Sequence, residues 1–123
     1  MGNKGFFAIP PGENSKALVW IAVKASDFLN SWVNYVTVSV PASYAKDERM
    51  GLVYLRGIIS TGTINTNAFV LPFGYRPLYQ YVFATISNAA IGRLDVKPDG
   101  SVLPQAGNNT YFSLNGIVFS VMP

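Results

Sequence analysis

From residue 17 onward the chain consists of short apolar runs separated by Gly, Pro, Asn and Asp, which favour turns. In Asn34–Val40 every second residue from Val36 is a valine, so Val36, Val38 and Val40 would share one face of an extended chain. A period of two is typical of a strand with one buried side. The pattern therefore predicts a strand over residues 34–40.

The segment Ile91–Lys97 alternates in the same way and leads into a turn. Leu94 and Val96 would face the core, whereas the charged residues between and around them would face water, namely Arg93, Asp95 and Lys97. The turn Pro98-Asp99-Gly100 then closes a hairpin, because Pro presets φ and Gly accepts the left-handed position after a type I turn. The chain returns along Ser101–Leu103.

Further runs complete an all-β pattern. Leu52–Ser60 is apolar on both sides except at Arg56, which predicts an inner strand, and Gly57 within it suggests a bulge or a close backbone approach. Other strands are expected at Phe69–Leu71, Tyr79–Ile86 and Tyr111–Val121, and only Ser26–Ser31 and Ala42–Arg49 could hold a turn of helix. Short strands with frequent turns predict a small antiparallel β-sandwich or β-barrel. Residues 17–123 would form this single domain, and residues 1–16 an extended N-terminal arm.

The composition is unusually apolar for a domain of 123 residues. Half of the residues are hydrophobic and only 12% are charged, about half the usual share of charge. The longest apolar run, Ala17–Val23, is far shorter than the roughly twenty residues of a membrane span, so membrane insertion is not expected. Burial of the surplus apolar surface between copies of the chain predicts a homo-oligomer.

The polar residues offer little for catalysis or for nucleic-acid binding. The nine Lys and Arg residues are dispersed, although phosphate binding favours clustered cations. The chain has no histidine and no cysteine, which removes the commonest general base, the usual thiol nucleophile and the commonest metal ligands. Its six carboxylates show no pairing of the kind that a glycosidase needs. We therefore expect no enzyme activity, no catalytic residues, no metal site and no cofactor.

Aromatic residues are the best candidates for ligand contacts, because a ring with a polar edge serves core, interface and sugar stacking alike. Trp20, inside an apolar run, is predicted to be core. The face formed by Tyr79, Tyr81 and Phe83 could be an inter-subunit stripe or a ligand platform, and we favour the stripe. Two large rings among small polar residues form the first candidate site, which comprises Asn30, Ser31, Trp32, Asn34 and Tyr35. The second is Tyr75 and Arg76, at the tip of a loop bounded by prolines.

Six segments in a fixed order carry a family resemblance across about two thirds of the chain. They are Tyr44–Asp47, Gly51–Gly57, Gly62–Thr63, Phe69–Pro77, Val96–Val102 and Tyr111–Phe119. In this order they resemble the C-terminal head domains of bacteriophage and prophage tail-fibre and baseplate receptor-binding proteins.

The resemblance implies a homotrimer that binds saccharide on the host cell surface during adsorption. It also implies contacts with other phage tail or baseplate proteins, and a place in the virion after synthesis in the bacterial cytoplasm. The alternative is a structural tail or baseplate protein of the same fold that binds other virion proteins and has no ligand site. A carbohydrate-binding accessory to a phage lytic enzyme is a third, less favoured hypothesis.

Overall fold

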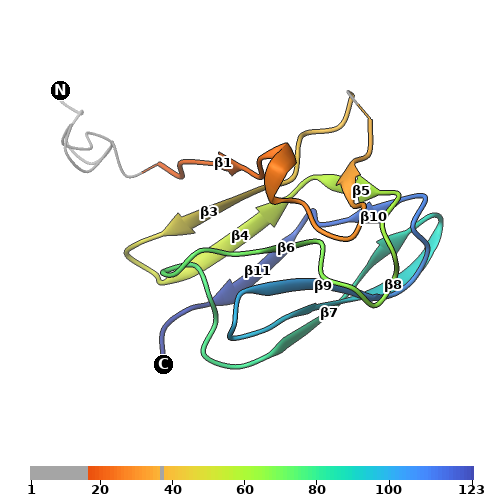
Figure 1. Cartoon of the computed structure of the whole chain (residues 1–123). Coiled ribbons are helices and arrows are strands. Elements are labelled where there is room, and N and C mark those ends of the chain that lie inside the picture. The colour runs from red at the N-terminus through yellow and green to blue at the C-terminus, as the bar shows by residue number, and fades with distance from the viewer. Residues whose placement is uncertain (1–16, 37) are drawn as a thin grey trace, which may run out of the picture.

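A computed structural model describes residues 17–36 and 38–123, and the expected arm over residues 1–16 lies outside them (Figure 1). Antiparallel strands and one short 3-10 helix, η1 (Ala25–Asp27), make up the regular structure of the described chain. Within these residues no helix is long and apolar enough to span a membrane. The expectation of an all-β antiparallel fold is confirmed, and its form is that of a small β-sandwich.

The described residues form two four-stranded sheets and one three-stranded sheet (Figure 1). The first four-stranded sheet has the order β1 (Ile21–Ala22), β3 (Ser43–Asp47), β4 (Leu52–Arg56), β11 (Ile117–Ser120). The second has the order β6 (Phe69–Val70), β9 (Ser101–Ala106), β8 (Ala90–Val96), β7 (Tyr81–Ser87). The small sheet has the order β10 (Phe112–Ser113), β5 (Ile58–Ser60), β2 (Val33–Asn34).

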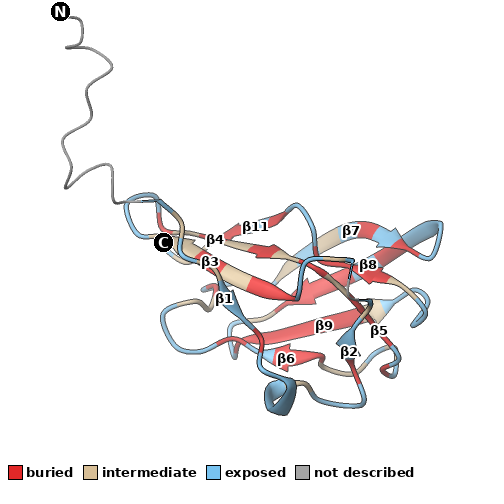
Figure 2. Ribbon diagram, turned by 90° about the horizontal axis from the view of Figure 1, so that it is seen from above, coloured by how far each residue is buried: buried red, intermediate tan, exposed pale blue. Residues whose placement is uncertain are grey.

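One hydrophobic cluster joins all three sheets, with members such as Val53 of β4, Leu94 of β8 and Ile59 of β5. Alternate residues of β4 and β11 point into it, so buried and less buried positions follow one another along these strands (Figure 2). Phe119 of β11 packs against Tyr81 and Phe83 of β7, with ring centres 6.0 and 6.5 Å apart. Tyr81 and Phe83 are partly buried and add to the apolar contact between these two sheets.

The predicted hairpin between β8 and β9 is confirmed. Gly100 has φ +90° and donates its N–H to the Lys97 carbonyl at 2.8 Å. The Asp99 carboxylate accepts the Ser101 N–H at 2.9 Å. This bond, more than the nearby positive charges, holds the pKa of Asp99 below its usual value.

Asp99 is therefore expected to make folding sensitive to acid. Because its folded-state pKa is lowered, its contribution to stability is present above the unfolded pKa of about 3.9. It is lost as the pH falls through the lower folded-state pKa. Asp99→Asn should lose less stability than the wild type between pH 4 and pH 2, as measured by thermal unfolding. Equal acid sensitivity of the two proteins would contradict this account of the turn.

Gly57 behaves as the sequence predicts, because it marks a close approach of two backbones. Its φ is +110°, and an added Cβ would lie 2.6 Å from the Ala42 Cα. Here the apolar run divides into β4 of the first sheet and β5 of the small sheet. The expected single strand Leu52–Ser60 is therefore two strands that belong to different sheets.

The strand expected over residues 34–40 is wrong beyond its first residue. β2 ends at Asn34, and Val36, Val38 and Val40 are exposed, Val38 to 91%. After Tyr35 donates to the Ile58 carbonyl at 2.8 Å, the chain turns away, and Ser39 donates to the Val36 carbonyl at 3.1 Å. Valine does occur at every second position, but no described layer of the fold covers these side chains.

Three smaller expectations also need correction. Residues 42–49, a possible helical turn, instead contain strand β3, whereas η1 does overlap the other possible turn, Ser26–Ser31. Asp95 was expected to face water, but only 3% of it is exposed because neighbouring side chains cover it. Trp20 is half-buried rather than core, and the Arg56 guanidinium lies 4.1 Å from its ring centre.

Candidate functional site

The first candidate site is not a ligand platform, because its central ring is inside the protein. Only 1% of Trp32 is exposed, and its ring packs edge-on against Phe112 with centres 6.2 Å apart. Gly62 lies against the indole so closely that an added Cβ would overlap it. The proposal that Trp32 stacks on a ligand at the surface is therefore wrong.

Its polar neighbours hold the fold together. The Asn30 amide donates to the Asn67 carbonyl at 2.9 Å, and the Asn34 side chain accepts the Ala42 N–H at 2.8 Å. Tyr35 is half-buried and packs edge-on against Tyr111, with ring centres 5.0 Å apart. A hollow of about 450 Å³ remains beside Asn34 and Tyr35, and none of the described residues that line it is charged.

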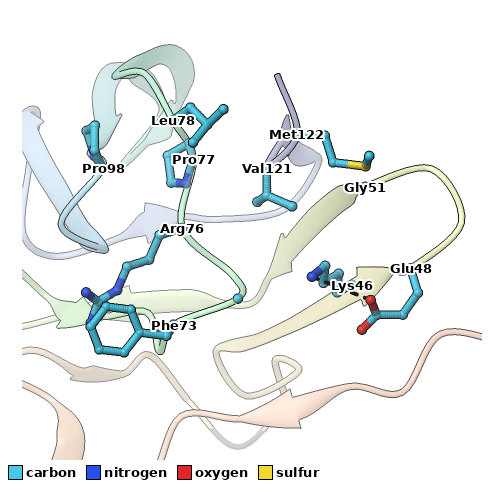
Figure 3. A pocket seen from close by; sticks show the side chains of 11 residues that line it. Lys46, Glu48, Gly51, Phe73, Arg76, Pro77, Leu78, Pro98, Val121 and Met122 are labelled. Atoms are coloured by element: carbon cyan, nitrogen blue, oxygen red, sulfur yellow. Dashed lines mark ion pairs between the residues drawn. The ribbon is translucent and has the colours of Figure 1, made fainter.

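The second candidate lies at a larger hollow of about 540 Å³ (Figure 3). Four parts of the chain meet there: the β3–β4 hairpin, the loop between β6 and β7, the turn between β8 and β9, and the segment after β11. Its lining residues are Lys46, Glu48, Gly51, Phe73, Gly74, Arg76, Pro77, Leu78, Pro98, Val121 and Met122. Arg76, one of the two residues of the second candidate site, therefore lines this hollow.

An exposed aromatic ring stands at one side of this hollow. Phe73 is 85% exposed, and the Arg76 guanidinium lies 4.0 Å from its ring centre (Figure 3). Arg76 is itself fixed, because its Nε donates to the Leu71 carbonyl at 2.7 Å. The cation therefore orients the ring from one face.

Charged groups lie across the hollow from Phe73 (Figure 3). Lys46 Nζ is 3.5 Å from a Glu48 carboxylate oxygen, and the glutamate side chain is 77% exposed. A pair of this kind is weak in water, so both groups remain able to hydrogen-bond to a ligand. The site thus combines an apolar ring with donors and an acceptor.

Tyr75 has a different position from Arg76. Its ring packs edge-on against Tyr44 at 5.0 Å, and Lys46 Nζ lies 6.0 Å from its centre. Burial is the main cause that raises the pKa of Tyr44 in this pair. Tyr75 lines a neighbouring hollow of about 280 Å³, which shares Lys46 and Glu48 with the larger one.

The sequence pointed to the loop with Arg76, but not to the Phe73 ring or to Lys46 and Glu48 on the opposite side of the hollow. Phe73 stands between Pro72 and Gly74, in a segment with no strand alternation, and that context could have marked it as an exposed aromatic. Lys46 and Glu48 carried no such signal. Their approach to the loop depends on the pairing of β3 with β4 and on packing between distant segments.

Several carboxylates have clear structural roles. Asp95 forms two hydrogen bonds with Arg93, and Asp47 accepts the N–H groups of Arg49 and Met50. Among the described residues, Glu48 alone contributes a carboxylate to the larger hollow. Over residues 17–36 and 38–123, no three His, Cys, Asp or Glu side chains gather as metal ligands would.

Comparison of the chain with protein-family models, with curated protein sequences and with solved structures finds no match.

Proposed function

We propose that the chain is a non-catalytic attachment module of a bacteriophage tail, which binds a saccharide of the host cell surface. The observation that carries the binding proposal is the exposed Phe73 ring, held by Arg76 beside a hollow with polar groups on its opposite wall. The phage assignment rests on the sequence resemblance over residues 44–119.

The chemistry of the hollow suits a sugar. A pyranose presents C–H groups on its faces and hydroxyls around its rim, so an aromatic ring can cover the face while polar side chains bind the rim. Phe73 provides the ring, and Lys46 and Glu48 provide a donor and an acceptor on the other side. Arg76 keeps further guanidinium N–H groups besides the Nε–H that Leu71 accepts.

The loop that carries Phe73 is held at several points. Leu71 donates its N–H to the Gly100 carbonyl at 2.8 Å, and Tyr75 donates to the Pro72 carbonyl at 3.1 Å. Together with the Arg76 bond, these contacts fix the backbone on both sides of Phe73 before any ligand arrives. A pre-organised loop loses less conformational entropy on binding.

A single open hollow of this size would bind a sugar weakly, so attachment requires several copies that act together. The homotrimer implied by the resemblance would supply three hollows on one particle. We propose that other tail or baseplate proteins hold this assembly in the virion.

Phe73→Ala should weaken saccharide binding by about tenfold or more, because it removes the stacking surface. The measurement is binding of the fluorescently labelled protein to an array of bacterial surface polysaccharides and to bacterial cells. Tyr79→Ala is the matched control, since Tyr79 is 72% exposed but does not line the hollow. Undiminished binding by Phe73→Ala, or equal losses in both variants, would contradict the proposed site.

A structural role in the tail is the second candidate. The observation that favours it is the set of exposed apolar side chains on β7 and β8, since such surfaces bind other proteins. A wild-type protein that binds no saccharide on the array, but is located by antibody inside an assembled tail, would favour this role over attachment.

A further inference from the structure

Strand β7 has apolar side chains on both of its faces. On the inner face Tyr81 and Phe83 pack against Phe119, so the predicted inter-subunit stripe through these two residues faces the core instead. On the outer face Val82 is 55% exposed and Ile86 is 50% exposed. A strand at a solvent face normally carries polar residues there, so the outer side of β7 has the composition of a covered face.

The neighbouring strands extend this surface. In the antiparallel register Ala84 lies opposite Arg93, and Ile86 lies opposite Ile91, which is 71% exposed. Ala106 of β9 lies on the other side of Arg93. Residues directly opposite one another share a face of the sheet. Val82 likewise lies opposite Asp95. The β7–β8 outer face is therefore defined by Val82, Ala84, Ile86, Ile91, Arg93, Asp95 and Ala106.

This face carries both a projection and a depression. A shallow hollow of about 290 Å³ lies on it, and of the described residues that line it Arg93 is the only polar one. The small residues Ala84, Gly92 and Ala106 leave the space, while Ile91 projects beside it. A branched side chain and a depression on one face can interlock with the same face of a second copy, in a pair or around a closed ring.

The charges on this face compensate one another. Arg93 donates to both oxygens of Asp95, through Nε at 2.9 Å and through Nη2 at 3.1 Å, and Gln80 donates to Asp95 at 3.3 Å. The β7–β8 outer face is thus neutral, although the chain as a whole carries a formal charge of +3. Contact through a neutral face avoids placing like charges of two positively charged copies against one another.

We propose that the β7–β8 outer face binds a second copy of this chain, with Ile91 of each copy in the hollow of a neighbour. The face is too poor in hydrogen-bonding groups for a sugar and lacks the clustered cations that nucleic acid requires. The inference does not depend on saccharide binding, because it concerns a different face from the Phe73 hollow.

Light scattering and sedimentation of the full chain test the proposal. The wild type should form a particle of two or more copies of the 13.4 kDa chain at micromolar concentration. Val82→Lys and Ile91→Lys should each weaken association by about 100-fold, because a charge then replaces a buried branched side chain. Val38→Lys is the matched control, since Val38 is 91% exposed on the loop after β2. A monomeric wild type, or an assembly that both β-strand variants leave intact, overturns the proposal.

A second measurement covers the case in which the lysine variants fail to fold. The chain has no cysteine, so Ala84→Cys places one small thiol on the face. In the assembled protein this thiol should react with a soluble alkylating reagent at least tenfold more slowly than the thiol of Val38→Cys, and dilution should remove the difference. Equal reactivity in the assembly overturns the proposal, as does protection that persists in the monomer, which would show that the chain covers its own face.

Discussion

Trp32→Ala is expected to lower the free energy of unfolding by about 3–5 kcal/mol, the usual cost of removing a large aromatic side chain from a core. Trp32 is the largest of the fully buried side chains. It fills the space between Phe112 and Gly62, and the missing side chain on Gly62 leaves room for the indole. Alanine would leave a cavity that these neighbours cannot close without moving strands of the small sheet.

Trp32→Phe provides the matched comparison. The indole Nε1 is buried and has no hydrogen-bond partner among the described residues. Phenylalanine keeps most of the apolar volume and removes this unpaired N–H. Removal of the buried donor offsets part of the stability that the smaller ring loses. We therefore expect the free energy of unfolding to fall by only about 1 kcal/mol. Chemical denaturation monitored by circular dichroism measures both values. A Trp32→Ala protein of unchanged stability that no longer binds host cells would instead make Trp32 a ligand residue.

The sequence was informative where local chemistry decides the structure. Pro98, Asp99 and Gly100 specify their turn through backbone preferences and one short-range hydrogen bond, and the hairpin forms as predicted. Gly57 is similar, because a glycine within an apolar run indicates a backbone that approaches closely, as Ala42 does here. The all-β class follows from many such local signals.

The errors concern contacts between distant parts of the chain. The alternating valines 36, 38 and 40 satisfy the pattern of a strand, but burial requires a second layer, and the described residues place none over them. Trp32 has polar neighbours in sequence and apolar ones in space, notably Phe112. For the same reason the loop with Arg76 could be selected from its prolines, whereas the opposite wall at Lys46 and Glu48 could not.

Gly100→Ala should have the second large effect, and it should affect the proposed site as well as the fold. At φ +90° any L side chain is strained, which costs about 1–2 kcal/mol. The added Cβ would also lie 2.5 Å from the Leu71 carbonyl oxygen and 2.6 Å from Arg76 Nε. Relief of this overlap requires a backbone shift that costs about 1–3 kcal/mol more.

Gly116→Ala separates the two contributions. Gly116 has φ +81°, but a Cβ there meets no described atom within 4 Å. It should therefore show the backbone strain alone, and the excess loss in Gly100→Ala measures the overlap with the loop. Thermal and chemical unfolding of the two variants give this difference. Equal losses of stability in the two variants would mean that the loop moves away from the added Cβ with no measurable loss of free energy.

The same pair of variants connects the turn to ligand binding. The Arg76 Nε–H donates to the Leu71 carbonyl at 2.7 Å, and this bond helps to fix the Phe73 loop. A Cβ added at Gly100 would approach both of these atoms. A Cβ between them should displace Arg76 from the Phe73 ring. Gly100→Ala is therefore expected to weaken saccharide binding about tenfold at a temperature where it is fully folded, whereas Gly116→Ala should bind like the wild type. If folded Gly100→Ala bound normally, the hairpin would be a folding element without influence on the site.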